Sequence, residues 1–145
     1  MSGLEARAVR LAHEAFAAIR LEAARAYPHE GCGALLGPAA GEVSETLALP
    51  NEEQTSPRVR FTVSPRDYLA TEASADARGL SLLGFWHSHP DHPARPSQTD
   101  RVYAWPGLLT LVIAVAGGEP GELTAWDVPG LEEPFRQLEL KVDRD

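Results

Sequence analysis

GFWHSHPDHPARPSQTD, residues 84–100, contains three of the five histidines in the chain and its densest cluster of potential metal-binding side chains. The apolar residues at 80, 82, 83, 85 and 86 predict a β-strand, and residues two apart on a strand point to the same face. His87 and His89 are therefore expected to aim both imidazoles at one point. Prolines at 90, 93 and 96 then predict a loop, because proline cannot continue a strand.

This loop leads to Ser97 and Asp100, at a predicted helix start. Two imidazoles and the Asp100 carboxylate form a three-ligand set that leaves the fourth tetrahedral position to water, as in catalytic zinc sites. The stretch therefore predicts Zn²⁺ bound by His87, His89 and Asp100. Ser97-Gln98-Thr99-Asp100 is also a helix-capping pattern, and Ser64-Pro65-Arg66-Asp67 has the same form with no histidine nearby in sequence. Capping alone does not explain why Ser97 and Asp100 follow the two histidines so closely.

His87-Ser88-His89-Pro90, then six residues, then Ser97-x-x-Asp100 resembles the metalloprotease motif of the JAMM family (JAB1/MPN/Mov34, MPN+ type), in its stand-alone bacterial branch. That motif also requires an upstream glutamate, and Glu30 in EGCGALLG, residues 30–37, stands at the matching place. Five positions in two distant segments agree in type, order and spacing. The resemblance covers most of the chain, is weakest over the last third, and implies the curved MPN sheet.

The resemblance implies hydrolysis of an amide or isopeptide bond. A zinc hydrolase needs a carboxylate that does not bind the metal and carries a proton from water to the leaving amine, a task that falls to Glu30. Ser97 is expected to donate a hydrogen bond to the oxyanion. The implied substrate is the C-terminal tail of a ubiquitin-like or sulfur-carrier protein. A cell-wall or phage-tail peptidase and a noncatalytic MPN-type scaffold remain as alternatives.

Residues 87–92, HSHPDH, also spell H-x-H-x-D-H, the motif of metallo-β-lactamase-like hydrolases. In that interpretation Asp91 and His92 would be metal ligands. The chain is short for such a fold, and no histidine follows His92 to complete its site. We therefore expect His92 to be a loop residue.

Composition narrows the class of protein. The 145 residues suffice for a single domain, 1–145, with one core. A net charge of −8 disfavours nucleic acid as a partner, because a phosphate backbone would be repelled. The lone Cys32 excludes an intramolecular disulfide and suits a reducing cytoplasm. No apolar run is long enough to cross a membrane, and the N-terminus does not resemble a signal peptide.

Hydrophobic periodicity predicts an α/β fold in which helices flank a mixed sheet. An amphipathic helix is expected from Leu4 to about Tyr27, and a second over residues 65–78 with Ser64 as its cap. The run LLTLVIAVA, residues 108–116, is apolar on both faces and predicts a central strand. Further strands are expected over residues 32–36, 43–49, 59–63 and 122–128, with an exposed edge strand over 138–142.

Overall fold

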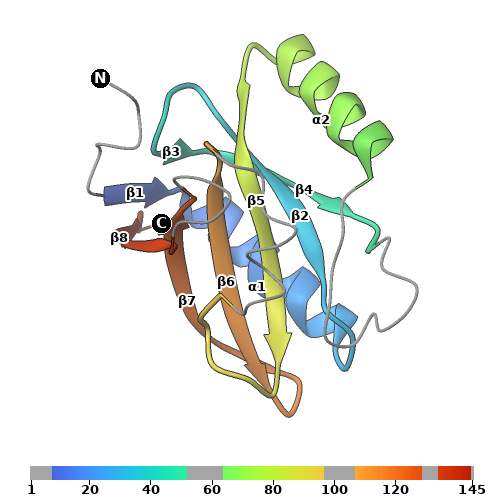
Figure 1. Cartoon of the computed structure of the whole chain (residues 1–145), viewed down its shortest axis with the longest axis vertical. Helices are drawn as coiled ribbons and strands as arrows, with labels where there is room; N and C mark the ends of the chain where they lie inside the picture. Colours follow the sequence, from blue (N-terminus) through green and yellow to red (C-terminus); the bar gives the residue numbers. More distant parts are fainter. Residues whose placement is uncertain (1–7, 52–63, 97–106, 129–133, 145) are drawn as a thin grey trace.

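A computed structural model describes residues 8–51, 64–96, 107–128 and 134–144. Its strands are β1 (Ala8–Leu11), β2 (Cys32–Gly37), β3 (Glu42–Val43), β4 (Glu45–Leu49), β5 (Ser81–Pro90), β6 (Leu109–Ala116), β7 (Glu119–Asp127) and β8 (Arg136–Val142), and its helices are α1 (His13–Ala26) and α2 (Pro65–Ala77). The strands form one sheet in the order β3-β1-β8-β7-β6-β5-β2-β4 (Figure 1). β5 and β6 run parallel, whereas β2 and β7 are antiparallel to their neighbours, so the predicted mixed sheet is confirmed.

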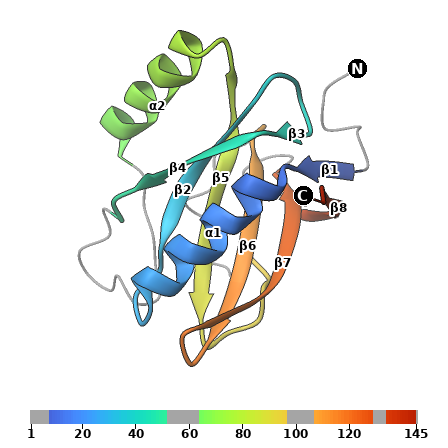
Figure 2. The same cartoon turned by 180° about the vertical axis from the view of Figure 1, so that it is seen from behind.

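Two apolar clusters lie on opposite faces of this sheet. α1 packs across one face, where Ile19 and Ala23 meet Trp86, Leu111 and Ile113 (Figure 2). α2 covers only part of the other face, where Ala75 and Tyr68 contact Phe85. Because side chains alternate along β5, Trp86 faces α1 while Phe85, His87 and His89 share the face that α2 leaves partly uncovered.

α2 begins and ends where the sequence indicates. The Ser64 hydroxyl accepts a hydrogen bond from the Asp67 amide at 3.1 Å, and Pro65 occupies the first helical position. Gly79, with φ of 71°, follows the last turn in the left-handed conformation that glycine adopts readily.

The prediction that a helix begins near Leu4 is wrong for the described residues. Ala8–Leu11 form a strand, and α1 begins at His13. Apolar residues at 8, 9 and 11 fit both the helical and the strand periodicity. These residues are extended because β1 pairs in parallel with β8. The same pairing corrects a second prediction: β8 lies between β7 and β1, so it is not an edge strand.

Other predicted elements follow the sequence closely. β2 and β6 match their predicted strands within a residue, and β6 lies in the interior of the sheet, as its apolar faces indicate. The predicted strand over 43–49 is divided into β3 and β4 at Ser44. The predicted strand over 59–63 and the predicted helix from Ser97 lie outside the described residues. In the described part of the chain, no helix is long and apolar enough to cross a membrane.

Candidate metal-binding and catalytic site

The two histidines at the end of β5 converge as the sequence predicts. His87 is 1% exposed and His89 is 7% exposed. Their Nε2 atoms lie 3.2 Å apart. Two imidazoles on one tetrahedral zinc ion, with Zn–N bonds of about 2.05 Å, would place these atoms about 3.3 Å apart. The pair therefore already has the spacing that a shared metal ion requires.

The His89 ring is oriented by the loop that follows β5. Its Nδ1 lies 2.8 Å from the Pro93 carbonyl oxygen, which can only accept, so Nδ1 carries the proton and donates. A neutral imidazole with its proton on Nδ1 presents the lone pair of Nε2. That lone pair faces His87, and such an orienting contact on the second nitrogen is typical of histidines that bind metals.

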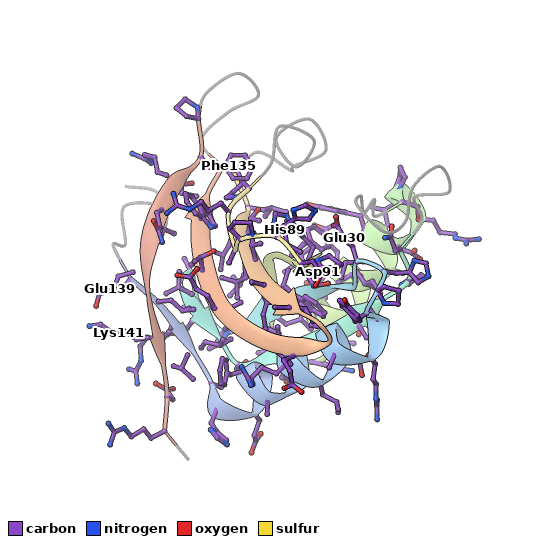
Figure 3. The ribbon with its side chains drawn as sticks, turned by 90° about the horizontal axis from the view of Figure 1, so that it is seen from below. Glu30, His89, Asp91, Phe135, Glu139 and Lys141 are labelled. Atoms are coloured by element: carbon purple, nitrogen blue, oxygen red, sulfur yellow. The ribbon has the colours of Figure 1, made fainter. Side chains whose placement is uncertain are left out.

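Glu30 reaches the same place from a distant part of the sequence. β2 pairs antiparallel with β5 so that Cys32 lies opposite His87. One residue further, the Ser88 amide donates to Gly31 O at 3.0 Å, and the Gly31 amide donates to the Ser88 hydroxyl at 2.8 Å. The same register places Glu30 opposite His89 with both side chains on one face, as Figure 3 shows.

The position of Glu30 is fixed although it precedes β2. The residue is only 5% exposed. Asn51, just after β4, donates from Nδ2 to the Glu30 carbonyl oxygen at 3.2 Å. Ser88 and Asn51 thus help to position Glu30. The sequence favours a loop at Asn51 but predicts neither of these contacts. For Ser88, its place in the sequence between two candidate ligands was the only indication of a role at the site.

The other two predicted site residues, Ser97 and Asp100, lie outside the described residues. Within residues 8–51, 64–96, 107–128 and 134–144, no group of three histidine, cysteine or acidic side chains is placed to hold a metal. Of the predicted site residues, the structure pairs His87 with His89 and places Glu30 nearby, as a residue that is not one of the proposed metal ligands. The roles of Ser97 and Asp100 stay predictions from the motif.

Asp91 has a different role from the one that the H-x-H-x-D-H pattern suggests. Its Oδ1 accepts a hydrogen bond from the Gly117 amide and its Oδ2 accepts one from the Tyr27 hydroxyl, each at 2.8 Å. Its φ of 58° places it in the left-handed region, where aspartate is among the tolerated residues. Asp91 therefore braces the turn after β5 against Tyr27, just after α1, and against the β6–β7 turn. His92 is exposed, as expected of a loop residue.

Solved structures share this architecture. A solution structure of a Desulfitobacterium hafniense protein is 28% identical, covers 94% of both chains and has a TM-score of 0.82. A JAB1/MPN domain protein from Archaeoglobus fulgidus is 19% identical, covers 94% of this chain and 98% of that one, and has a TM-score of 0.63. The fold is therefore that of the JAB/MPN class, and the predicted curved mixed sheet flanked by helices is confirmed.

Sequence comparison identifies the family. Residues 12–129 match the family described as prokaryotic homologs of the JAB domain, and the chain belongs to it. A desampylase from Haloferax volcanii is 31% identical over 117 residues, which are 80% of both chains. A probable TtuB-protein conjugate cleaving protease from Thermus thermophilus is 38% identical over 76 residues, 52% of this chain and 49% of that protein. The resemblance to the JAMM family and the assignment as a hydrolase are thus confirmed.

Proposed function

We propose that this protein is a zinc-dependent isopeptidase that cleaves the bond at the C-terminal tail of a ubiquitin-like or sulfur-carrier protein. The observation that carries the proposal is the meeting of three buried side chains. The Nε2 atoms of His87 and His89 lie 3.2 Å apart, and Glu30 lies near His89, just before β2, where the Gly31–Ser88 hydrogen bonds join the two segments (Figure 3). Paired imidazoles beside a carboxylate are the parts of a metal-assisted hydrolase.

The donor atoms fit zinc. Imidazole nitrogen is a preferred zinc ligand, and the contact between His89 Nδ1 and Pro93 O leaves Nε2 as the nitrogen available to a metal. Asp100 would supply the third ligand, as the motif indicates. Three protein ligands leave one position for water or substrate, the arrangement of a catalytic rather than a structural zinc site.

Each residue then has a task in hydrolysis. Zinc held by these residues would supply Lewis acidity to the scissile carbonyl and would lower the pKa of the attacking water to about 7. Glu30 accepts a proton from the attacking water and returns it to the departing amine as the carbon–nitrogen bond breaks. Ser97 donates a hydrogen bond to the oxyanion that forms on the former carbonyl.

The relatives support the substrate class. The desampylase matches this chain over 80% of both lengths, and the second relative is named for cleaving TtuB-protein conjugates. We propose that this protein likewise acts on conjugates or C-terminal extensions of small carrier proteins. The lone Cys32 favours a reducing compartment, so we propose that the protein works in the cytoplasm. We also propose that residues 1–145 form a single domain.

The test is to incubate the purified protein with a carrier protein that bears residues beyond its Gly-Gly terminus, and with a carrier joined to lysine, with and without a chelator. Mass spectrometry should show cleavage after Gly-Gly that the chelator abolishes and added zinc restores, and elemental analysis should find zinc bound. Zinc without carrier cleavage would favour a cell-wall or phage-type peptidase. Carrier binding without zinc or cleavage would favour a noncatalytic scaffold.

A further inference from the structure

The loop after β5 folds back over β6 and β7 (Figure 1), and side chains hold it there. The His89 ring donates to the Pro93 carbonyl at 2.8 Å. Thr124, on β7, donates from its hydroxyl to the next carbonyl, that of Ala94, at 2.6 Å. Ala94 is fully buried, so this carbonyl has little access to water. Two consecutive loop carbonyls are therefore fixed, one by His89 and the other by the sheet.

Thr124 is positioned for this contact by strand register. His87 lies opposite Val112 on β6, and Val112 lies opposite Thr124 on β7, so all three side chains share the face that carries the site. The Thr124 hydroxyl accepts a hydrogen bond from Trp126 Nε1 at 2.7 Å, which leaves its single proton for a carbonyl. Ala94 O, at 2.6 Å, is nearer than Val112 O at 3.4 Å.

We propose that Thr124 is a positioning residue for metal binding: its hydroxyl fixes the loop that orients His89. The inference rests on the proposed function for its link to zinc, but the loop geometry stands independently of it. A threonine whose hydroxyl only satisfied its own strand would bond to a carbonyl within the sheet. The shorter contact of Thr124 is with the loop rather than with Val112 in the sheet, and it lies one residue from the carbonyl that fixes the His89 tautomer.

Removing the hydroxyl should release the loop without creating a cavity. Thr124→Val keeps the side-chain volume and leaves the buried Ala94 carbonyl without its donor, so the loop is expected to shift until that oxygen reaches water. Loss of a hydrogen bond to a metal-binding side chain typically weakens metal binding 10–100-fold. Thr124 acts on His89 through the loop rather than by direct contact, so we expect zinc affinity to fall about tenfold. Thr124→Ser keeps the hydroxyl donor, so its zinc affinity should stay within about twofold of wild type.

Thr71 offers a matched control on α2. It is 3% exposed, and its hydroxyl donates to the Asp67 carbonyl at 2.7 Å. Thr71→Val therefore removes an equally buried hydroxyl bonded to a backbone carbonyl, on an element that does not carry the histidines. It should change the melting temperature but leave zinc affinity within about twofold of wild type.

The experiment measures zinc affinity by chelator competition and hydrogen exchange of the Arg95 amide, which bonds to Pro93 O at 2.8 Å within the loop. Thr124→Val should weaken zinc binding and speed this exchange about tenfold, while Thr124→Ser and Thr71→Val should do neither. Wild-type exchange in Thr124→Val would overturn the inference, whether or not the protein binds zinc. Equal loss of affinity in Thr71→Val would also overturn it, because the effect would then be general destabilisation.

A second variant covers the case in which Thr124→Val does not fold. Trp126→Phe removes the indole donor that orients the Thr124 hydroxyl, at a half-buried position that should tolerate the change. Zinc affinity should then fall about threefold, with faster exchange at Arg95. Unchanged affinity and exchange in this variant would contradict the proposed role of Thr124. Absence of zinc from wild-type protein would instead contradict the proposed function, and exchange alone would then decide the inference.

Discussion

Glu30→Gln tests the proposed proton carrier separately from the proposed metal site. The amide has nearly the same size as the carboxylate, and Asn51 holds the Glu30 backbone carbonyl, so the side chain should keep its place beside His89. Glutamine cannot accept a proton from water at neutral pH. A positioned general base contributes about 10²–10⁴-fold to rate, or about 3–5 kcal/mol of barrier at 1.36 kcal/mol per tenfold.

We expect kcat to fall about 10³-fold, the middle of the range for a positioned general base. Asp91, the acidic residue of the adjoining turn, has its two oxygens engaged by Gly117 and Tyr27. Single-turnover cleavage of a carrier conjugate, followed by mass spectrometry, would measure the chemical step directly. Zinc content and melting temperature should match wild type, since the proposed ligands are unchanged.

His29 provides the control for this substitution. It precedes Glu30 in sequence but is exposed, so His29→Gln should alter kcat by less than about twofold. If Glu30→Gln, loaded with zinc, kept more than about a tenth of the wild-type rate, Glu30 would not be the proton carrier. A loss of zinc in the same variant would instead identify Glu30 as a ligand, which the proposed mechanism forbids.

Three further changes test the site and the fold that supports it. His87→Ala should abolish stoichiometric zinc binding and cleavage while the protein stays folded, and retained zinc by elemental analysis would contradict the ligand assignment. Gly84→Ala would place a Cβ 1.9 Å from the Leu109 carbonyl oxygen on β6, so denaturant unfolding should show that the free energy of unfolding falls by about 3 kcal/mol or more. Gly121→Ala is the control: its Cβ would lie 3.7 Å from the nearest atom, and the free energy of unfolding should change by less than about 0.5 kcal/mol. Tyr27→Phe removes one hydrogen bond to Asp91 and should cost about 1 kcal/mol by the same assay; no measurable loss would show that the brace is energetically neutral.

The sequence predicted those parts of the fold in which local pattern and tertiary context agree. β6 is apolar on both faces and lies inside the sheet, and Ser64 followed by proline marks the start of α2. The sequence does not predict β1 because the strand has only four residues, and its apolar side chains at 8, 9 and 11 fit a helical and an extended pattern equally well. Its pairing with β8 joins residues more than 100 positions apart, and no local pattern contains that information.

For the site, the spacing of His87 and His89 predicted their convergence, because side chains two residues apart on a strand point to the same face. The proximity of Glu30 followed only from the family resemblance, since it depends on the register between β2 and β5. The supporting contacts from Ser88, Asn51 and Thr124 were not predicted. A serine, asparagine or threonine has no distinctive periodicity, and its partner becomes visible only when the backbone carbonyls are placed.

The unequal coverage of the two sheet faces explains why the site lies where it does. α1 buries apolar residues from β5, β6 and β7 on one face, whereas α2 reaches only the part of the other face around Phe85. Beyond Phe85, the same face of β5 changes to His87 and His89, both buried. Burying imidazoles and a carboxylate is costly unless their polar atoms are bonded. Here Pro93 O accepts a hydrogen bond from the His89 ring, and two hydrogen bonds between Gly31 and Ser88 hold the segment next to Glu30 against β5. A cation shared by the two Nε2 atoms would offset more of that cost, so the proposed zinc ion would contribute both to catalysis and to the stability of this end of the sheet.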